Sequence, residues 1–449
     1  MDKNNGAIYD ARKLGKPKMI ILGVQHMFAM FGATILVPIL TGLDISTTLL
    51  MAGLGTLLFH CITKFKVPAF LGSSFAFLGG YAAIKAFSPN DPNSMLPYAC
   101  LGVACAGLIY FILAAVIKAV GIEKVMRFFP PVVTGPIIIA IGLGLAPSAV
   151  SNCTTNWFLA VVALAVIVVF NIWGKGMAKI IPIILGLLIS YGTGLVLYFI
   201  SQANPDLIQN VPWLFSGGAD ANGVYQPIFD FTSLNTICDN ISKGHIFGSE
   251  GLIGIPIHWD KTVFGGIDYS NGALIASSII AIVPIAFATM MEHIGDICAI
   301  SSTTGNNYIK DPGLHRTLVG DGLATTLASL FGGPANTTYG ENTGVLALTR
   351  VYDPRVIRIA AYFAVAVSFF PIVSVIIGSI PSCIIGGISF VLYGMIPAIG
   401  VRNVVENKVD FTKSRNLIVA AVILVCALGL ASDTVSFTIG SAAITLSPL

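Results

Sequence analysis

Long apolar runs separated by short polar segments occupy most of this chain. A run of about twenty apolar residues can cross the hydrocarbon core of a bilayer as a helix. Seven candidate spans come before residue 201, and six follow residue 272: 19–41, 46–63, 68–87, 96–119, 128–147, 157–173 and 180–200, then 273–300, 317–332, 337–349, 356–378, 382–400 and 415–432. The pattern predicts an all-α polytopic membrane protein.

Two of these runs, 68–87 and 337–349, are interrupted by glycines and polar residues, and the second contains Glu341. Irregular backbone at membrane depth is tolerated only where it lines a cavity or is buried in protein. A carboxylate inside a span costs several kcal/mol and usually marks a functional site. Paired broken spans of this kind are typical of the substrate site of a transporter.

The composition agrees with a membrane protein, because 55% of the residues are hydrophobic and only 10% are charged, against roughly a quarter charged in soluble domains. The net charge of +3 gives no reason to expect a nucleic-acid partner. The eight cysteines are scattered without metal-ligand spacing, so no metal or cofactor is predicted. A disulfide between Cys153 and Cys238, both expected outside, stays open.

The basic residues predict the orientation of the chain. Residues 1–18 form a positive arm, and the first apolar run is too long for the core of a signal peptide. With the N-terminus in the cytoplasm, all but three of the 24 Lys and Arg fall on the inner side, the exceptions being Lys85, Lys243 and Lys261. This bias is the positive-inside pattern. Residues 201–272 become an extracytoplasmic loop, which we interpret as a surface loop rather than a substrate lid.

The two halves of the chain contain similar motifs. Gln25-His26 precedes the broken run at 71–77, and Glu292-His293 precedes the broken run at 338–341 by nearly the same separation. An odd number of spans, seven, comes before the second copy. The two copies are therefore expected to form inverted repeats, with substrate bound near the midplane between their broken spans.

Few acidic residues lie inside the predicted spans, and they suggest what the substrate is. Glu292 and Asp296 are four residues apart on one helix face, with His293 beside them. Asp296 and Asp321 are both left open between a functional and a structural role. Carboxylates accept N–H groups, whereas the N-termini of half-helices attract carbonyl oxygens. Aromatic residues such as Phe75 and Tyr339 could stack on a flat ring. These groups suit an uncharged heterocycle such as a pyrimidine or purine base.

Several motifs support this hypothesis by resemblance. Glu341-Asn342-Thr343-Gly344, followed after four residues by Thr349-Arg350, resembles the signature of the nucleobase-ascorbate transporter family. Within that family, the motifs resemble those of the bacterial uracil permeases in particular. The further motifs that resemble them are Gln25-His26, residues 71–77, Glu292-His293-Ile294-Gly295, residues 311–316 and residues 336–342.

The resemblance implies fourteen spans in two inverted repeats of seven, with short β-strands in spans three and ten. Residues 19–126 and 273–380 would form a core domain, and residues 127–200 and 381–449 a gate domain through which two copies could pair. Glu292 and Glu341 would accept the N–H groups of the base. The backbone at Phe75 and Gly340 would contact the base, and Tyr339 and Asp296 would complete the pocket.

The resemblance also implies proton-coupled uptake of uracil across the bacterial cytoplasmic membrane by alternating access. Glu292, His293 and Asp296 would take part in proton coupling, and the proton gradient would replace any cofactor. At the position of Asp296 the uracil-permease motif that this stretch resembles has a histidine. The aspartate keeps a xanthine or uric acid carrier as the alternative substrate class, whereas Glu341 favours uracil. A weak last apolar segment, 434–449, is expected to be the start of a fourteenth span, and because the sequence ends soon after Ser447-Pro448, that span is expected to be truncated or replaced.

Two other classes of protein fit the sequence less well. An anion exchanger or channel would favour cations or bare helix N-termini at the broken spans, whereas this chain has Glu292 and Glu341 there. A membrane-embedded enzyme is not supported either, because the sequence contains no HExxH, GxSxG or P-loop motif.

Overall fold

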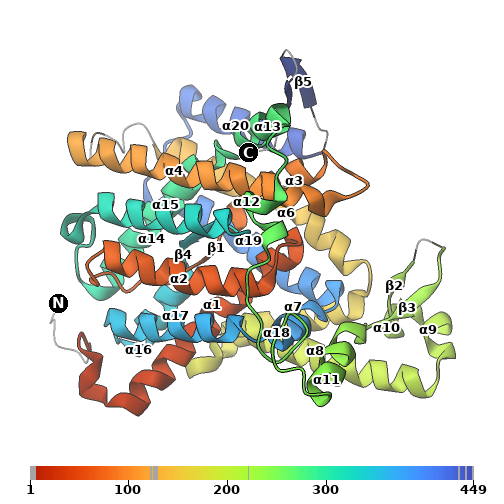
Figure 1. The fold of residues 1–449 in the computed structure, drawn as a ribbon. Coiled ribbons are helices and arrows are strands. Elements are labelled where there is room, and N and C mark those ends of the chain that lie inside the picture. The colour runs from red at the N-terminus through yellow and green to blue at the C-terminus, as the bar shows by residue number, and fades with distance from the viewer. Residues whose placement is uncertain are drawn as a thin grey trace. The chain divides into compact units, whose positions relative to one another are not determined.

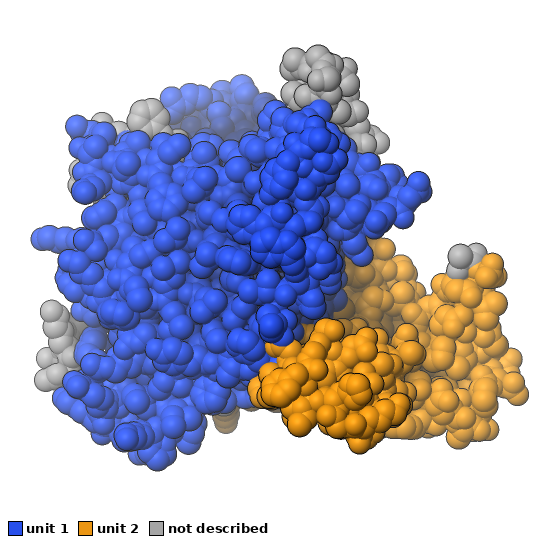
Figure 2. Space-filling model, viewed as in Figure 1, with its two compact units in different colours: residues 1–140, 255–369, 400–449 blue, residues 141–254, 370–399 orange. Residues whose placement is uncertain are grey.

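The computed structural model describes residues 7–121, 124, 130–179, 181–220, 222–432, 435–439 and 442–446. Contacts along the chain divide it into two compact units, coloured separately in Figure 2. Unit 1 contains residues 1–140, 255–369 and 400–449, and unit 2 contains residues 141–254 and 370–399. The predicted division into a core domain and a gate domain stays a prediction.

The structure is mainly helical, which confirms the predicted fold class (Figure 1). The longer helices are α1 (Lys16–Thr41), α2 (Ile45–Ile62), α4 (Leu96–Val120), α6 (Pro131–Cys153), α7 (Trp157–Trp173), α8 (Pro182–Ala203), α14 (Ile285–Thr304), α15 (Leu314–Leu330), α17 (Pro354–Ser368), α19 (Ser382–Glu406) and α20 (Ser414–Ser432). The shorter ones are α3 (Leu78–Lys85), α9 (Asp206–Asn210), α10 (Pro212–Phe215), α11 (Thr232–Ser242), α12 (Val263–Gly266), α13 (Gly272–Ile282), α16 (Gly340–Thr349) and α18 (Pro371–Gly378). Short one-turn or irregular helices are η1 (Ala11–Leu14), η2 (Phe75–Phe77), η3 (Pro92–Met95), η4 (Gly176–Lys179), η5 (Trp259–Lys261) and η6 (Ile309–Gly313).

Local signals in the sequence explain where several helices begin and end. Gly42 ends α1 in the left-handed conformation, which glycine adopts without steric cost. Asp44 caps the start of α2 by accepting from the backbone of Thr47 at 2.7 Å, and Asn156 does the same for α7. Within the described residues, seven helices are long and apolar enough to cross a membrane, or eight if α17 and α18 are counted as one bent span.

Three predicted segments differ from the structure. The run 273–300 is divided into α13 and α14 around Pro284, and the run 356–378 into α17 and α18 before Pro371. Proline lacks the N–H that would continue a helix and disfavours helical backbone in the residue before it. The predicted start of a last span contains instead two antiparallel strands, β5 (Val435–Ile439) and β6 (Ala442–Leu446). The alternating apolar and polar residues of β5 are typical of a strand.

In unit 1, the helices α4, α15, α2, α17 and α1 pack one against the next in that order. Two three-residue strands, β1 (Leu71–Ser73) and β4 (Asn336–Thr338), lie against α2 and are fully buried. They confirm the prediction that the two broken spans contain short strands. Helix α14 packs against α16 and against β4.

Unit 2 contains α7 and α8 and most of the loop predicted outside the membrane. The loop has local structure, including a hairpin of β2 (Ser216–Ala219) and β3 (Tyr225–Pro227) and the helix α11. Phe229 and Phe231 stack at 5.2 Å between ring centroids, and Tyr198 packs edge-on against both rings. The cysteines are free thiols, Cys153 and Cys238 among them, so the disulfide left open by the sequence is not formed.

Candidate functional site

The site begins at the pairing of the two broken spans. Strands β1 and β4 are antiparallel, and Gly72 lies opposite Thr337 at the centre of the register. The ladder continues at both ends, because Ser74 N donates to Ala335 O at 2.9 Å and Tyr339 N donates to Phe70 O at 3.0 Å. Residues far apart in the sequence therefore meet at one place. The mutual pairing satisfies backbone groups that lipid could not.

Side chains of neighbouring helices hold the outer edges of the two strands. Leu71 N donates to Thr56 Oγ1 of α2 at 2.9 Å. Asn336 Nδ2 donates to Met51 O of α2 at 2.9 Å, and Thr325 Oγ1 of α15 donates to Asn336 O at 2.5 Å. Buried backbone polar groups without partners are costly, so these side chains replace the missing neighbouring strands. The strand pair is a rigid base from which both half-helices start.

Tyr339 connects the two broken spans through its side chain. Its hydroxyl donates to Ser73 O at 2.8 Å and lies 3.3 Å from the Oγ1 of Thr34 on α1. A Cβ placed on Gly72 would lie only 2.5 Å from Cε2 of this ring. The tyrosine is buried and packs against the glycine backbone. This position suits the predicted supporting role better than stacking on a substrate.

Two half-helices begin beside the strand pair. Phe75 starts η2, which continues into α3, and is half-buried. Gly340 starts α16 with Tyr339 as its N-cap, and it is exposed. The first N–H groups of a helix have no partner within the helix and attract carbonyl oxygens or negative charge. The backbone of Glu341 lies in the first turn of α16, but its side chain is outside the described part of the structure.

One acidic residue of α14, Asp296, lies beside this start of α16. Asp296 is half-buried and accepts a hydrogen bond from Thr338 Oγ1 of β4 at 2.8 Å. Its other carboxylate oxygen lies 3.8 Å from where a Cβ on Gly340 would stand. Glu292, one helical turn earlier, is exposed. The site therefore combines carboxylate acceptors with the N-terminal N–H groups of a helix.

A second, fully buried pair lies behind Asp296. His293 Nδ1 is 3.3 Å from Asp321 Oδ2 of α15, and both side chains have no exposed surface. The same His293 nitrogen is 3.5 Å from Thr338 Oγ1. Asp296, Thr338, His293 and Asp321 thus follow one another within short distances, from a half-buried group to the interior. Asp321, which the sequence left open, belongs to this buried series.

The signature residue Asn342 is also tied to the first span. Its Nδ2 atom donates to His26 O of α1 at 3.3 Å and lies at the same distance from His26 Nδ1. The two motifs that contain these residues are thus in contact and fix α16 to α1. Sequence reasoning did not identify Thr34 or Thr56, because buried threonines in apolar runs carry no spacing signal that separates them from packing residues. Thr338 lies in a motif that the sequence singled out, but no role was assigned to its side chain.

Most predicted site residues that the structure describes lie close together in unit 1. Helix α14, which carries Glu292, His293 and Asp296, packs against η2 with Phe75, against β4 and against α16 with Gly340. A bundle of apolar helices around two paired broken spans, with acids beside a helix N-terminus, is the architecture of a membrane transporter.

Comparison with known proteins identifies the family. The model of the permease family matches residues 17–435, so the chain belongs to the permease family and is a multi-pass membrane transporter rather than an enzyme. It is 38% identical over 421 residues to the uracil permease of Bacillus caldolyticus, with 91% of this chain and 85% of that protein covered. It is also 38% identical over 423 residues to the uracil permease of Bacillus subtilis, with the same coverage.

A solved structure shares the fold. The transmembrane domain of a cyanobacterial bicarbonate transporter matches 95% of this chain and 98% of its own length, with a TM-score of 0.64 and 12% identity. At that identity the likeness concerns the fold alone. It indicates that the helices around the two broken spans follow an arrangement already observed in a membrane transporter.

Proposed function

We propose that this protein takes up uracil across the bacterial cytoplasmic membrane, with its N-terminus in the cytoplasm. The observation that carries the proposal is the position of Asp296 on α14 beside Gly340, the first residue of α16, with Glu292 one helical turn earlier on the same helix. The matching relatives are named uracil permeases. The site offers the groups that such a base requires.

Uracil is a flat ring whose edge alternates N–H donors and carbonyl acceptors. Glu292 and Glu341 would accept the N–H groups, since an ionised carboxylate offers acceptors only. The backbone N–H groups at Gly340 and Phe75 would donate to the carbonyl oxygens. Tyr339 would keep the two half-helices in register without contacting the reading edge of the base. Two kinds of partner at fixed spacing would exclude ligands that lack either group.

We propose that uptake is coupled to protons, and no cofactor other than the gradient is involved. Glu292 would carry the proton, because it is an exposed carboxylate on α14 and would lose its charge when it takes up a proton. His293 and Asp296 would respond to this change through Thr338. Binding of proton and base would let the core domain move against the gate domain, with two copies paired through the gate.

Asp296 supports an alternative substrate within the same family. This aspartate is more like the purine carriers, and its second oxygen lies near Gly340, where it could accept an additional N–H of xanthine or uric acid. Anion exchange is less well supported, because α14 presents two acids beside the helix N-terminus. The fold shared with a bicarbonate transporter does not alter this preference, since fold alone does not determine the substrate.

The proposal is tested by uptake of labelled uracil into proteoliposomes with an imposed pH gradient. Glu292→Gln should reduce uptake by at least about tenfold, the effect of losing one charge-assisted hydrogen bond of roughly 1.5–3 kcal/mol. A protonophore should abolish accumulation above equilibrium. Unlabelled uracil should compete with labelled uracil more strongly than xanthine or uric acid does.

A matched control is Glu250→Gln in the extracytoplasmic loop, which leaves the site unchanged. Uptake by Glu292→Gln equal to that of the parent, in protein of the same reconstituted amount, would remove the carboxylate from the binding role. Stronger competition by xanthine than by unlabelled uracil would assign the purine alternative.

A further inference from the structure

The segment immediately before α1 is ordered against unit 1, although the proposed transport mechanism gives it no role. Ile8 forms a parallel bridge with Val351, directly after α16. Its N–H donates to Arg350 O and its carbonyl accepts from Tyr352 N, both at 2.8 Å. Residues that the sequence predicts only as a positive N-terminal arm are thus paired with the C-terminal end of α16.

The next residue of the same segment reaches α14. The hydroxyl of Tyr9 donates to Thr304 O at 2.7 Å, and Thr304 is the last residue of α14. The last carbonyls of a helix have no partner within the helix, so Tyr9 supplies one. The Tyr9 ring packs edge-on against Tyr352 at 5.5 Å between centroids. One residue therefore contacts the end of α14 and the loop that follows α16.

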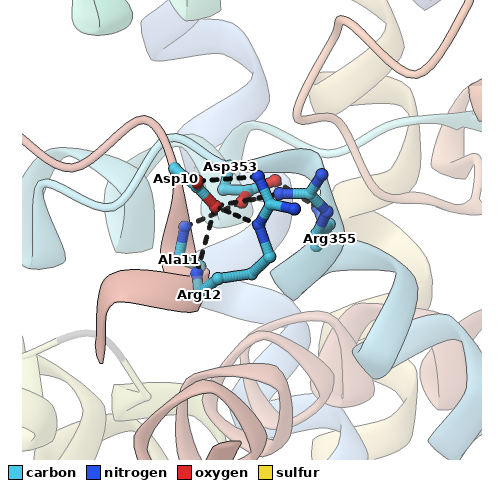
Figure 3. Close-up of polar contacts among 5 residues, drawn as sticks. All are labelled: Asp10, Ala11, Arg12, Asp353 and Arg355. Carbon is cyan, nitrogen blue, oxygen red and sulfur yellow. Dashed lines mark hydrogen bonds and ion pairs between the residues drawn. The ribbon is translucent and has the colours of Figure 1, made fainter. Parts of the chain in front are cut away.

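A charged cluster fixes the segment to the start of α17, as Figure 3 shows. Asp10 Oδ1 accepts from Arg12 Nε at 2.9 Å and from Arg355 Nη1 at 3.0 Å. The backbone N–H of Ala11 donates to Asp353 Oδ2 at 2.8 Å, and Asp353 also pairs with Arg355 at 3.2 Å. These contacts hold both the backbone and the side chains of residues 10–12 against the start of α17.

Apolar burial lies beneath the charged cluster. Ala11 has no exposed surface and packs with Val351 and Val356. Ile8, Leu14, Met19 and Leu22 surround these three residues and are partly buried. A solvated tail would show neither this burial nor hydrogen bonds to α14, to the start of α17 and to the backbone that follows α16. The segment is a built part of unit 1.

Helices α14 and α16 carry Glu292, Asp296 and Gly340, the main candidate ligands of the substrate. Because α16 has only 10 residues, or about 15 Å of helix, a shift at its end moves its start. We propose that residues 8–12 form a clasp that holds the end of α16 against the end of α14 and thereby sets substrate affinity. The effect on affinity rests on the proposed function, whereas the effect on the two helices does not.

The clasp is tested with Tyr9→Phe, which removes only the bond to α14, and Asp10→Ala, which removes the acceptor shared by Arg12 and Arg355. Tyr352→Phe is the matched control, because it removes a hydroxyl from the neighbouring ring and leaves the Tyr9 bond to Thr304 in place. Asp10→Glu is the conservative variant. Hydrogen–deuterium exchange of peptides covering 298–304 and 340–350 reports on the helix ends, and uptake kinetics report on affinity.

Both test variants should exchange faster in these peptides than the parent and the control. The KM for uracil should rise about threefold to tenfold, the change expected for one lost hydrogen bond, with little change in kcat. Asp10→Glu should restore both values. A merely structural role would lower the melting temperature and leave KM unchanged, and that result would overturn the effect on affinity.

Unchanged exchange at 340–350 in both variants would overturn the clasp itself, whatever the substrate is. If the parent protein failed to take up uracil while exchange still increased in the variants, the proposed function would fail and the clasp would stand. The two failures are therefore distinguishable in one set of preparations.

Discussion

At the centre of the site, the absence of a side chain at Gly72 allows Tyr339 to pack against the backbone of β1. At Gly72 the backbone of β1 passes so close to Tyr339 that a Cβ would overlap the ring and would also lie 2.7 Å from Thr34 Oγ1. The tyrosine can hold both broken spans only because no side chain intervenes. Glycine at this position is a requirement of close approach, and the sequence alone does not show which of the 47 glycines has that function.

Gly72→Ala adds only one methyl group, but we expect it to impair transport strongly. The added methyl must displace the Tyr339 ring, and such overpacking costs about 1–3 kcal/mol, so we expect lower melting temperature and loss of uracil uptake. Gly79→Ala is the matched control, because nothing lies within 4 Å of its added Cβ. Melting curves and uptake of the two purified variants provide the measurement. Equal behaviour of the two variants would show that Tyr339 can move without loss.

At the scale of elements, the apolar pattern predicts helices well because burial in lipid requires nothing beyond length and hydrophobicity. The bounds of α2 and α7 follow directly from their runs and capping residues. The pattern did not indicate the divisions at Pro284 and Pro371 or the register of β1 with β4. That register depends on tertiary contacts between segments far apart in the sequence, such as Asn336 with Met51.

For the candidate site too, the sequence indicated individual residues but not the contacts between separate elements. Intramembrane acids and broken spans stand out from an apolar background, so Glu292, Asp296 and Gly340 could be named from the sequence. The hydrogen bond from Thr338 to Asp296 and the contact of Asn342 with His26 could not, because both join separate elements. A basic N-terminal arm also gives no sign that its residues will be buried.

We expect Asp10 of the clasp to stay ionised over the physiological pH range. The hydrogen bond from Arg12 lowers the pKa of Asp10 from 3.8 to about 2. A lowered pKa means that the stabilising contribution is present above the ordinary value and is lost only as pH falls towards 2. Between pH 5 and 8, Asp10→Asn should therefore raise the KM for uracil without moving the midpoint of the pH profile of uptake. A displaced midpoint would show that Asp10 takes part in the titration that drives transport.

For the whole molecule, orientation in the membrane is the prediction on which the direction of uptake depends. Cys238 is exposed in the loop expected outside, and Cys61 is exposed near the end of α2 expected inside, beside Lys64 and Lys66. In variants that retain only one of these cysteines, a membrane-impermeant maleimide should label Cys238 in intact cells and Cys61 only after permeabilisation. The reverse pattern would invert the positive-inside assignment. Labelling of both thiols from outside would show that an even number of membrane crossings separates them. The first half of the chain could then not contain an odd number of spans, and the predicted inverted repeat would be wrong.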